Sequence, residues 1–309
     1  MLASIGSLPV RVTAKVPATC ANMGPGLDCL AMALDMWNTV TFEKSQQFEI
    51  VVEGEGRNEL PLTRDNLVYR AFETFHRQKQ EPSPCVKISC RNDIPLGRGL
   101  GSSAAAIVSG LIAANAFSVT PLPEREMLRL AASLEGHADN VTATLAGGCV
   151  AVLYYAGEVS YCQISVPTGL KAVAFIPDFR MGTKEGRKLL EAPFPIEDVV
   201  FNIERVALLV TAFNTERLDA LRTATQDRLH QPRRRKLFPH MESIFDAALA
   251  AGALGIFLSG SGSSIIALTK GDEAHIGQAM ADRGAEVGIK SRIVVLPPSS
   301  QGARIVHCL

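Results

Sequence analysis

The chain has 309 residues, of which 47% are hydrophobic and 20% are charged, a composition typical of a folded globular protein and not of a disordered one. Its 31 basic residues balance 31 acidic residues, so no net field favours nucleic acid or a membrane as partner, and small molecules are the expected ligands. The N-terminus lacks the pattern of a leader, no apolar run reaches a membrane span, and the seven scattered cysteines form no CxxC pair. These features predict a cytoplasmic protein with reduced, mostly buried thiols.

The first half of the chain is rich in predicted strands. Alternation of polar and apolar residues predicts strands over residues 8–16, 37–44, 48–54 and 85–91. Two stripes at helical spacing predict helices that pack on the resulting sheet. The first stripe is Val68, Ala71, Phe72 and Phe75; the second, which follows Pro123 and stops at Gly136, is Met127, Leu130, Ala131 and Leu134.

The second half mixes strands and helices without the strict alternation of a doubly wound sheet. Strands are predicted over 170–177, 254–260, 263–270 and 291–297, and helices over 196–213, 240–252 and 272–284. We therefore predict an α+β protein of two domains, residues 1–165 and 166–309. The basic run "PRRRK" at 232–236 is typical of a solvated loop.

A glycine-rich stretch, "PLGRGLGSSAA" at 95–105, precedes an apolar run. Gly97, Gly99 and Gly101 let the backbone turn and approach another molecule, and Ser102 or Ser103 is expected to cap a helix that begins at Ala104. The free N–H groups and partial positive charge of such a helix start suit a phosphate. Taken alone, such a cluster is more often a plain helix start behind a flexible turn.

Two common nucleotide-binding schemes are excluded at this stretch. A P-loop needs lysine after its last glycine, where this chain has Ser102, and a dinucleotide fingerprint needs a third glycine at that same place. The remaining scheme is a phosphate site without lysine, made of backbone amides, with a serine hydroxyl available to Mg²⁺.

The stretch resembles the P-x-x-x-G-L-G-S-S-A motif of the GHMP kinase superfamily. "VPATCANMGPGLDCLAMAL" at 16–34 and "GALGIFLSGSGSSIIAL" at 252–268 resemble its N-terminal motif and its C-terminal glycine loop, in the same order. The resemblance implies a two-domain fold: an N-terminal βα sandwich with a left-handed-crossover-type ATP site, and a ferredoxin-like C-terminal domain. It implies ATP-binding residues at Pro95, Leu96, Gly97, Arg98, Gly99, Leu100, Gly101, Ser102, Ser103, Ala104, Ala105, Gly260 and Gly262.

Within this superfamily the motifs are most similar to those of the homoserine kinases. "PATCANMGPGLD", "EGHADNV" and "DRLHQPRRRKL" match that family's N-terminal, central and second-domain motifs. Cys20, Met23 and Leu27 are mild departures. Ser263 stands where the family usually has proline, so we expect a looser loop there.

The resemblance also implies a site for a zwitterion that ends in a primary alcohol. It places the carboxylate clamp at Arg187 and Arg234, and the ammonium partner at Asp28, near Asn22. Arg233 or Arg235 is an alternative to Arg234 if the register is off by one. Taken singly, each arginine is typical of a protein surface, and Asp28 of a turn.

The reacting groups implied by the resemblance lie in "EGHADN". His137 and Asn140 are expected beside the substrate hydroxyl, and Asp139 occupies the position of a candidate base in mevalonate kinase relatives. Mg²⁺ is expected on Ser102 or Ser103 and on Glu135, although Glu135 also fits a plain helix end. The implied reaction is in-line attack of the L-homoserine hydroxyl on the γ-phosphorus of ATP, with Asn140 favoured for orienting the alcohol and Asp139 kept as an alternative base.

Two other functions remain open from the sequence. One is a kinase of the same superfamily that acts on another small alcohol. The other is a binding or regulatory protein that keeps the fold without catalysis, which the serine at position 263 allows. The resemblance further implies a homodimer that supplies threonine synthesis.

Overall fold

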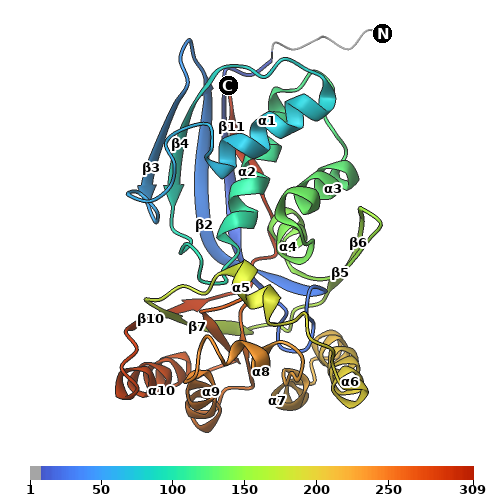
Figure 1. Ribbon diagram of the computed structural model, residues 1–309, viewed down its shortest axis with the longest axis vertical. Helices are drawn as coiled ribbons and strands as arrows, with labels where there is room; N and C mark the ends of the chain where they lie inside the picture. The colour runs from blue at the N-terminus through green and yellow to red at the C-terminus, as the bar shows by residue number, and fades with distance from the viewer. Residues whose placement is uncertain (1–7) are drawn as a thin grey trace.

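The computed structural model describes residues 8–309; residues 1–7, where the predicted first domain begins, lie outside the described residues. Figure 1 shows two stacked units, each with a sheet covered on one face by helices. The α+β fold class predicted from the sequence is confirmed. The described helices include none with the length and apolarity that a membrane crossing needs.

The first unit contains a seven-stranded sheet with the path β11-β1-β2-β4-β3, while β5 pairs with β2 and β6. Only the β3–β4 pair is parallel. The strands are β1 (Arg11–Ala21), β2 (Leu30–Lys44), β3 (Glu49–Gly54), β4 (Val86–Asn92), β5 (Cys149–Tyr155), β6 (Glu158–Ile164) and β11 (Arg304–Cys308). The helices on this sheet are α1 (Leu67–Lys79), α2 (Ser102–Phe117), α3 (Glu124–Glu135) and α4 (Asp139–Ala146).

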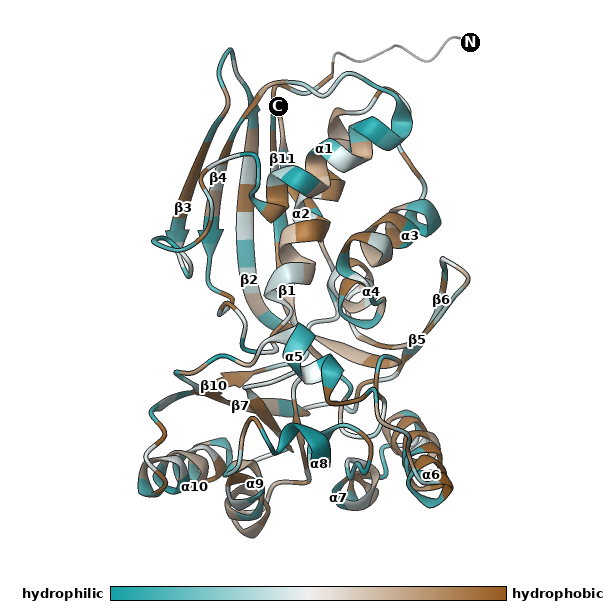
Figure 2. Cartoon of the chain, viewed as in Figure 1, coloured by the Kyte–Doolittle hydropathy of each residue, from teal (hydrophilic) through white to brown (hydrophobic). Residues whose placement is uncertain are grey.

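Apolar packing joins these helices to the sheet. The predicted stripe of α1 is buried, and the Phe72 ring stacks on Phe42 of β2 with 5.1 Å between ring centroids. Helix α2 carries no charged residue and is apolar on nearly every side, as Figure 2 shows, because α1, α3, α4 and β1 surround it. This packing fixes the N-terminal end of α2 at the boundary between the two units.

The second unit contains a four-stranded antiparallel sheet with the order β10-β7-β9-β8. Its strands are β7 (Lys171–Pro177), β8 (Gly255–Leu258), β9 (Ile265–Thr269) and β10 (Ser291–Leu296). Its helices are α5 (Thr183–Lys188), α6 (Ile196–Asn214), η1 (Leu218–Ala220), α7 (Leu221–Ala224), α8 (Gln231–Arg234), α9 (Met241–Ala250) and α10 (Glu273–Glu286). The strand order and the helices between β7 and β8 and between β9 and β10 are those of the predicted ferredoxin-like arrangement.

The chain passes from the first sheet to the second between Ile164 and Lys171, and it later returns. Strand β11 pairs with β1, so residues 304–308 lie in the first sheet and not with the rest of 166–309. The pairing partner of a terminal strand depends on tertiary packing, which local sequence does not encode. The division of the chain into two domains at residue 165 stays a prediction.

Three local expectations are wrong. Helix α2 begins at Ser102 and not Ala104, and its N-cap is Gly101, in a left-handed conformation with no side-chain cap from either serine. The "PRRRK" run is not a solvated loop throughout, because α8 ends at Arg234 and that side chain is only 3% exposed. Of the seven thiols, only three are buried: Cys20, Cys90 and Cys149.

Candidate active site

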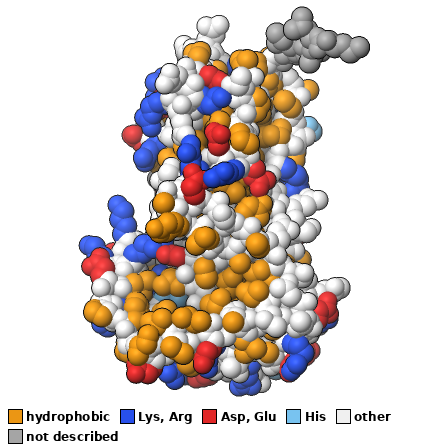
Figure 3. All heavy atoms as spheres, turned by 90° about the vertical axis from the view of Figure 1, so that its right-hand side faces the viewer, with side chains coloured by type: hydrophobic (Ala, Val, Ile, Leu, Met, Phe, Trp, Pro, Cys, Tyr) orange, Lys and Arg blue, Asp and Glu red, His pale blue; other side chains and the backbone are white. Residues whose placement is uncertain are grey.

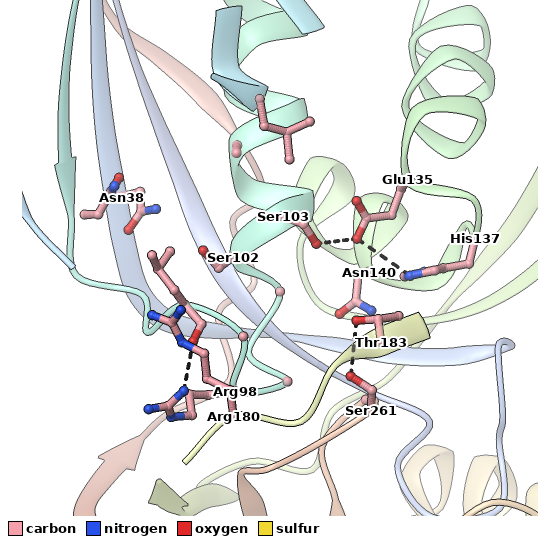
Figure 4. Close-up of a pocket in the computed structure, with 18 of the residues that line it drawn as sticks. Asn38, Arg98, Ser102, Ser103, Glu135, His137, Asn140, Arg180, Thr183 and Ser261 are labelled. Atoms are coloured by element: carbon pink, nitrogen blue, oxygen red, sulfur yellow. Dashed lines mark hydrogen bonds and ion pairs between the residues drawn. The ribbon is translucent and has the colours of Figure 1, made fainter. Parts of the chain in front are cut away.

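A cleft of about 430 Å³ lies where the two units meet, with the N-terminal end of α2 in its wall (Figure 4). Most of the predicted site residues line this cleft: Asn22, Asp28, Leu96, Gly97, Arg98, Gly99, Gly101, Ser102, Ser103, Glu135, His137, Asp139, Asn140, Arg187, Arg234 and Gly260. Five predicted ATP-binding residues do not line it and lie buried beside it: Pro95, Leu100, Ala104, Ala105 and Gly262. Their role in ATP binding stays a prediction.

The glycine loop needs its glycines for two reasons. Gly97, Gly99 and Gly101 all have positive φ, at 62°, 75° and 72°. A Cβ atom at Gly101 would lie 2.0 Å from Thr19 Oγ1, and one at Gly99 would lie 2.1 Å from the Ser259 carbonyl oxygen. The loop therefore presses against both units and brings the uncapped start of α2 to the cleft, where the helix dipole favours an anion.

A chain of polar side chains starts at the first turn of α2. The Ser103 hydroxyl donates to Glu135 Oε1 at 2.5 Å, and His137 Nε2 lies 3.6 Å from that same oxygen. His137 Nδ1 is in turn 2.7 Å from Asp139 Oδ1 (Figure 4 shows the first two contacts). Glu135 is the last residue of α3 and Asp139 the first of α4, so the turn at Gly136 sets the spacing between them.

Burial and charge shift the pKa values of Glu135 and His137. Desolvation raises the pKa of Glu135 above its ordinary value, and the Ser103 hydrogen bond and His137 oppose this only in part. Desolvation also acts to lower the pKa of His137, but Asp139 and Glu135 more than offset it, so the pKa of His137 is raised. The site therefore favours the protonated forms of Glu135 and His137 more than bulk water does.

Asn140 is held in one orientation. The Thr19 hydroxyl of β1 donates to Asn140 Oδ1 at 2.7 Å, and the Asn140 backbone N–H donates to Asp139 Oδ1 at 2.7 Å. The Asn140 Nδ2 group donates to Asp139 Oδ1 at 3.4 Å, a long hydrogen bond that uses one of its two hydrogens, so the second is left for the cleft. Asp139 is buried and accepts from both the His137 side and the backbone, so its carboxylate already has partners.

Asp28 and Arg187, predicted to bind opposite ends of a substrate, bind each other in this structure. Arg187 Nη1 and Nη2 donate to Asp28 Oδ2 and Oδ1 at 3.0 and 2.8 Å. Asn22 supports this arrangement, because its Oδ1 accepts from the Asp28 N–H at 3.1 Å and its Nδ2 donates to the Gly260 carbonyl at 2.9 Å. Asn22 and Asp28 both have positive φ, which short polar side chains tolerate.

Arg234 is the buried cation of the site. Its Nη1 donates to the Gly260 carbonyl at 2.7 Å and lies 2.9 Å from His230 Nδ1, while its Nε has no partner. Burial lowers the pKa of Arg234 to about 10. The register is the predicted one, because Arg233 donates to carbonyls at 189, 192 and 193, and Arg235 pairs with Glu242.

The expectation of a looser loop at Ser263 is not supported. Ser263 is fully buried, and its hydroxyl donates to the Phe179 carbonyl at 2.6 Å. This bond ties the C-terminal glycine loop to the segment after β7 and replaces the rigidity that a proline ring supplies in the family motif.

Several residues of the cleft escaped the sequence analysis. One end of the cleft is lined by apolar side chains and amides: Asn38, Val40, Leu60, Asn66, Leu67, Val68, Cys90 and Asn92. Other lining residues that the sequence analysis did not single out are Arg180, Thr183 and Ser261. Asn66 is the N-cap of α1, so its sequence signal is that of a cap. Asn38 lies within β2 and accepts from the backbone N–H groups of Asp93 and Ile94, far away in the sequence.

Within residues 8–309, no three histidine, cysteine or acidic side chains come together as a metal cage. Glu135 and the hydroxyls of Ser102 and Ser103 nevertheless place oxygen donors at the start of α2. Such a set fits Mg²⁺, which usually takes one or two protein oxygens and completes its shell with water and phosphate.

Comparison with known proteins agrees with this geometry. Residues 66–148 match the GHMP kinases N terminal domain, and residues 209–286 match the GHMP kinases C terminal domain. The chain therefore belongs to the GHMP kinases.

A finer assignment comes from its relatives. The chain is 41% identical to a homoserine kinase of Moorella thermoacetica, over 94% of this chain and 99% of the relative, and 40% identical to one of Carboxydothermus hydrogenoformans, over 94% and 96%. The crystal structure of a homoserine kinase from Cytophaga hutchinsonii superposes with a TM-score of 0.87 at 29% identity, covering 97% of this chain and 98% of that one. This chain belongs to the homoserine kinase family.

Proposed function

We propose that the protein phosphorylates the side-chain hydroxyl of L-homoserine with ATP and forms O-phospho-L-homoserine, a step of threonine biosynthesis. The observation that carries the proposal is a single cleft that joins an uncapped helix start to a set of groups suited to a zwitterion. A phosphate donor and an amino acid with a free alcohol can thus meet within one site.

The amino-acid end of the substrate binds at Asp28, Arg187 and Arg234. Asp28 accepts the ammonium, while Arg187 and the unpartnered Nε of Arg234 hold the carboxylate. A zwitterion offers each member of the Asp28–Arg187 pair a new partner of the right sign, so the pair opens without leaving a charge unpaired. A neutral sugar offers neither charge, and mevalonate offers only the negative one.

The triphosphate binds along the glycine loop at 95–105, with Gly260 of the second unit facing it across the cleft. The apolar end beside Leu60 and Val68 receives the base. Ser102, Ser103 and Glu135 would hold Mg²⁺, which would supply positive charge next to the transferring phosphoryl group. These residues position the donor for in-line attack.

The substrate hydroxyl lies beside His137 and Asn140. Asn140 orients the alcohol through Nδ2, since Thr19 holds its oxygen. His137 lies beside this position, and its raised pKa favours the positively charged form of the imidazole more than bulk water does. Positioning and charge account for the catalysis, and a strong base is not required. Asp139 remains the alternative base, and its two hydrogen bonds favour a positioning role.

We propose a cytoplasmic homodimer with no nucleic-acid or membrane partner. Helix α6 supports a protein contact, because Ile196, Val200 and Ile203 form an exposed apolar stripe along it. Figure 3 shows hydrophobic side chains gathered on the lower part of the face where this helix lies. Sedimentation of the wild type and of Ile203→Glu tests this directly: a dimer that the variant reduces to a monomer is expected.

A substrate comparison tests the function. ADP release is measured with Mg-ATP and L-homoserine, mevalonate or galactose, and we expect turnover with L-homoserine alone. Turnover with another alcohol would assign a different GHMP kinase. Binding of ATP and homoserine without ADP release would assign a catalytically impaired binding or regulatory protein.

A further inference from the structure

Four arginines line the cleft, and three of them either brace the glycine loop or belong to the proposed substrate site. Arg98 donates to the carbonyls of Leu96, Pro177 and Asp178, at 3.3, 2.8 and 2.5 Å. Arg187 and Arg234 belong to the zwitterion end described above. Arg98 therefore braces the glycine loop against the second unit, although its charge stays beside the loop.

The fourth arginine, Arg180, lies in the segment that follows β7 and crosses to the first unit. A Cβ atom at Gly97 would lie 3.2 Å from Arg180 Cδ and 3.7 Å from its Nε, so this side chain lies directly against the glycine loop. Figure 4 shows Arg180 and Arg98 side by side below the loop. The positive charge of Arg180 also acts to lower the pKa of Arg98, although desolvation is the larger cause. Two adjacent guanidiniums at one loop attract an anion.

Arg180 has a partner that it can exchange. Its Nη2 lies 2.6 Å from Glu59 Oε2, and the two side chains are 46% and 52% exposed. An ion pair this exposed adds little to the stability of the fold, so breaking it costs little free energy. A polyphosphate offers a guanidinium more charge and more acceptor oxygens than one carboxylate does. Glu59 lines the cleft as Arg180 does, so both members of the pair lie at the proposed nucleotide site.

We propose that Arg180 leaves Glu59 and binds the phosphates of the nucleotide, as a cation that the second unit supplies to the lysine-free glycine loop. The inference rests on the proposed placement of ATP in this cleft. It gives Glu59 a role as the resting counterion of Arg180.

Titration calorimetry with ATP and with adenosine tests the inference. We expect Arg180→Ala to weaken ATP binding by about tenfold, the size of one lost charge-assisted hydrogen bond, and to leave adenosine binding unchanged. Arg292→Ala is the matched control. Arg292 pairs at 3.0 Å with Glu55, which lies between β3 and α1 as Glu59 does, and Arg292 does not line the cleft. Its ATP affinity should stay within about twofold of wild type.

Two further variants distinguish a role of Arg180 in phosphate binding from a purely structural role of its ion pair with Glu59. Glu59→Gln removes the ion pair but keeps the phosphate ligand, so ATP should bind as tightly as in wild type or more tightly, and Arg180→Lys should recover part of the lost affinity. Equal losses in Glu59→Gln and Arg180→Ala, or none in Arg180→Ala, would overturn the inference. If wild-type protein itself failed to bind ATP, the proposed function would fall as well.

Discussion

Arg187 on α5 donates hydrogen bonds to both carboxylate oxygens of Asp28, at 2.8 and 3.0 Å, and so joins the two units across the cleft. Both side chains are about as exposed as other surface pairs, so the contact contributes little to the fold. Its value lies in holding two opposite charges in place for a substrate that carries both.

Asp28→Asn separates these two roles. The variant should raise KM for L-homoserine by about 10²-fold, because the ammonium loses a charged partner, and leave KM for ATP unchanged. The free energy of unfolding should fall by less than about 1 kcal/mol. Asp219→Asn is the matched control, since it breaks another two-bond pair, with Arg217, in the exposed segment after α6. Equal KM for homoserine in Asp28→Asn and wild type would contradict the assignment.

Arg234→Lys tests the buried end of the carboxylate clamp. Lysine keeps the charge but cannot present the fork of donors or reproduce the contact with Gly260, so KM for homoserine should rise by about tenfold or more. Arg235→Lys, one position along, changes a side chain that pairs with Glu242 at the surface and should change nothing. Steady-state kinetics with homoserine as the varied substrate distinguish the two.

Glu135→Gln should lower kcat on the order of 10²-fold, because the start of α2 loses its anionic oxygen donor beside Ser103. The free energy of unfolding of this variant should stay the same or rise, although its kcat falls. Desolvation raises the pKa of Glu135 in the folded state, so the wild type binds this proton more tightly when folded and loses stability as pH rises through that pKa. The thermal unfolding temperature of Glu135→Gln at pH 7 to 8 should be no lower than that of wild type. A marked loss of stability would indicate a structural role for the carboxylate.

The imidazole of His137 should titrate above its ordinary pKa, because the Asp139 and Glu135 carboxylates outweigh desolvation. The stabilisation from this charge is present below the unfolded pKa and fades as pH rises through the folded one. An NMR titration of wild type and Asp139→Asn should show the pKa of His137 fall in the variant. We expect this variant to keep kcat within about tenfold, whereas loss of general-base catalysis would cost 10² or more. A large loss with intact homoserine binding would make Asp139 the base.

Sequence reasoning located the parts of the site that are local in the chain. Gly97 to Ser103 and Glu135 to Asn140 each bring several contacts together within one turn, so their residue types carry a readable pattern. Arg180 and Asn38 carry no such pattern, because each reaches the cleft from a segment far away in the sequence. The packing of the two units brings Arg180 to the glycine loop, and the pairing of β2 with β4 brings Asn38 beside it.

Errors in the sequence reading have the same origin. Ser102 and Ser103 have the composition of a helix cap, but Glu135, 32 residues beyond Ser103, accepts that hydroxyl instead. Arg234 sits in a basic run that is typical of a solvated loop, but the turn of α8 directs it inward against Gly260. Strand β11 reads as part of the second unit until its pairing with β1 is known.

The central claim is that the uncapped start of α2 binds the terminal phosphates of ATP without a lysine. A crystal structure with a non-hydrolysable ATP analogue, Mg²⁺ and L-homoserine tests it most directly. We predict phosphate oxygens within hydrogen-bond distance of the backbone amides at Gly101 to Ser103, with the homoserine hydroxyl facing the terminal phosphorus. A nucleotide bound elsewhere, with protein atoms filling the start of α2, would contradict the account.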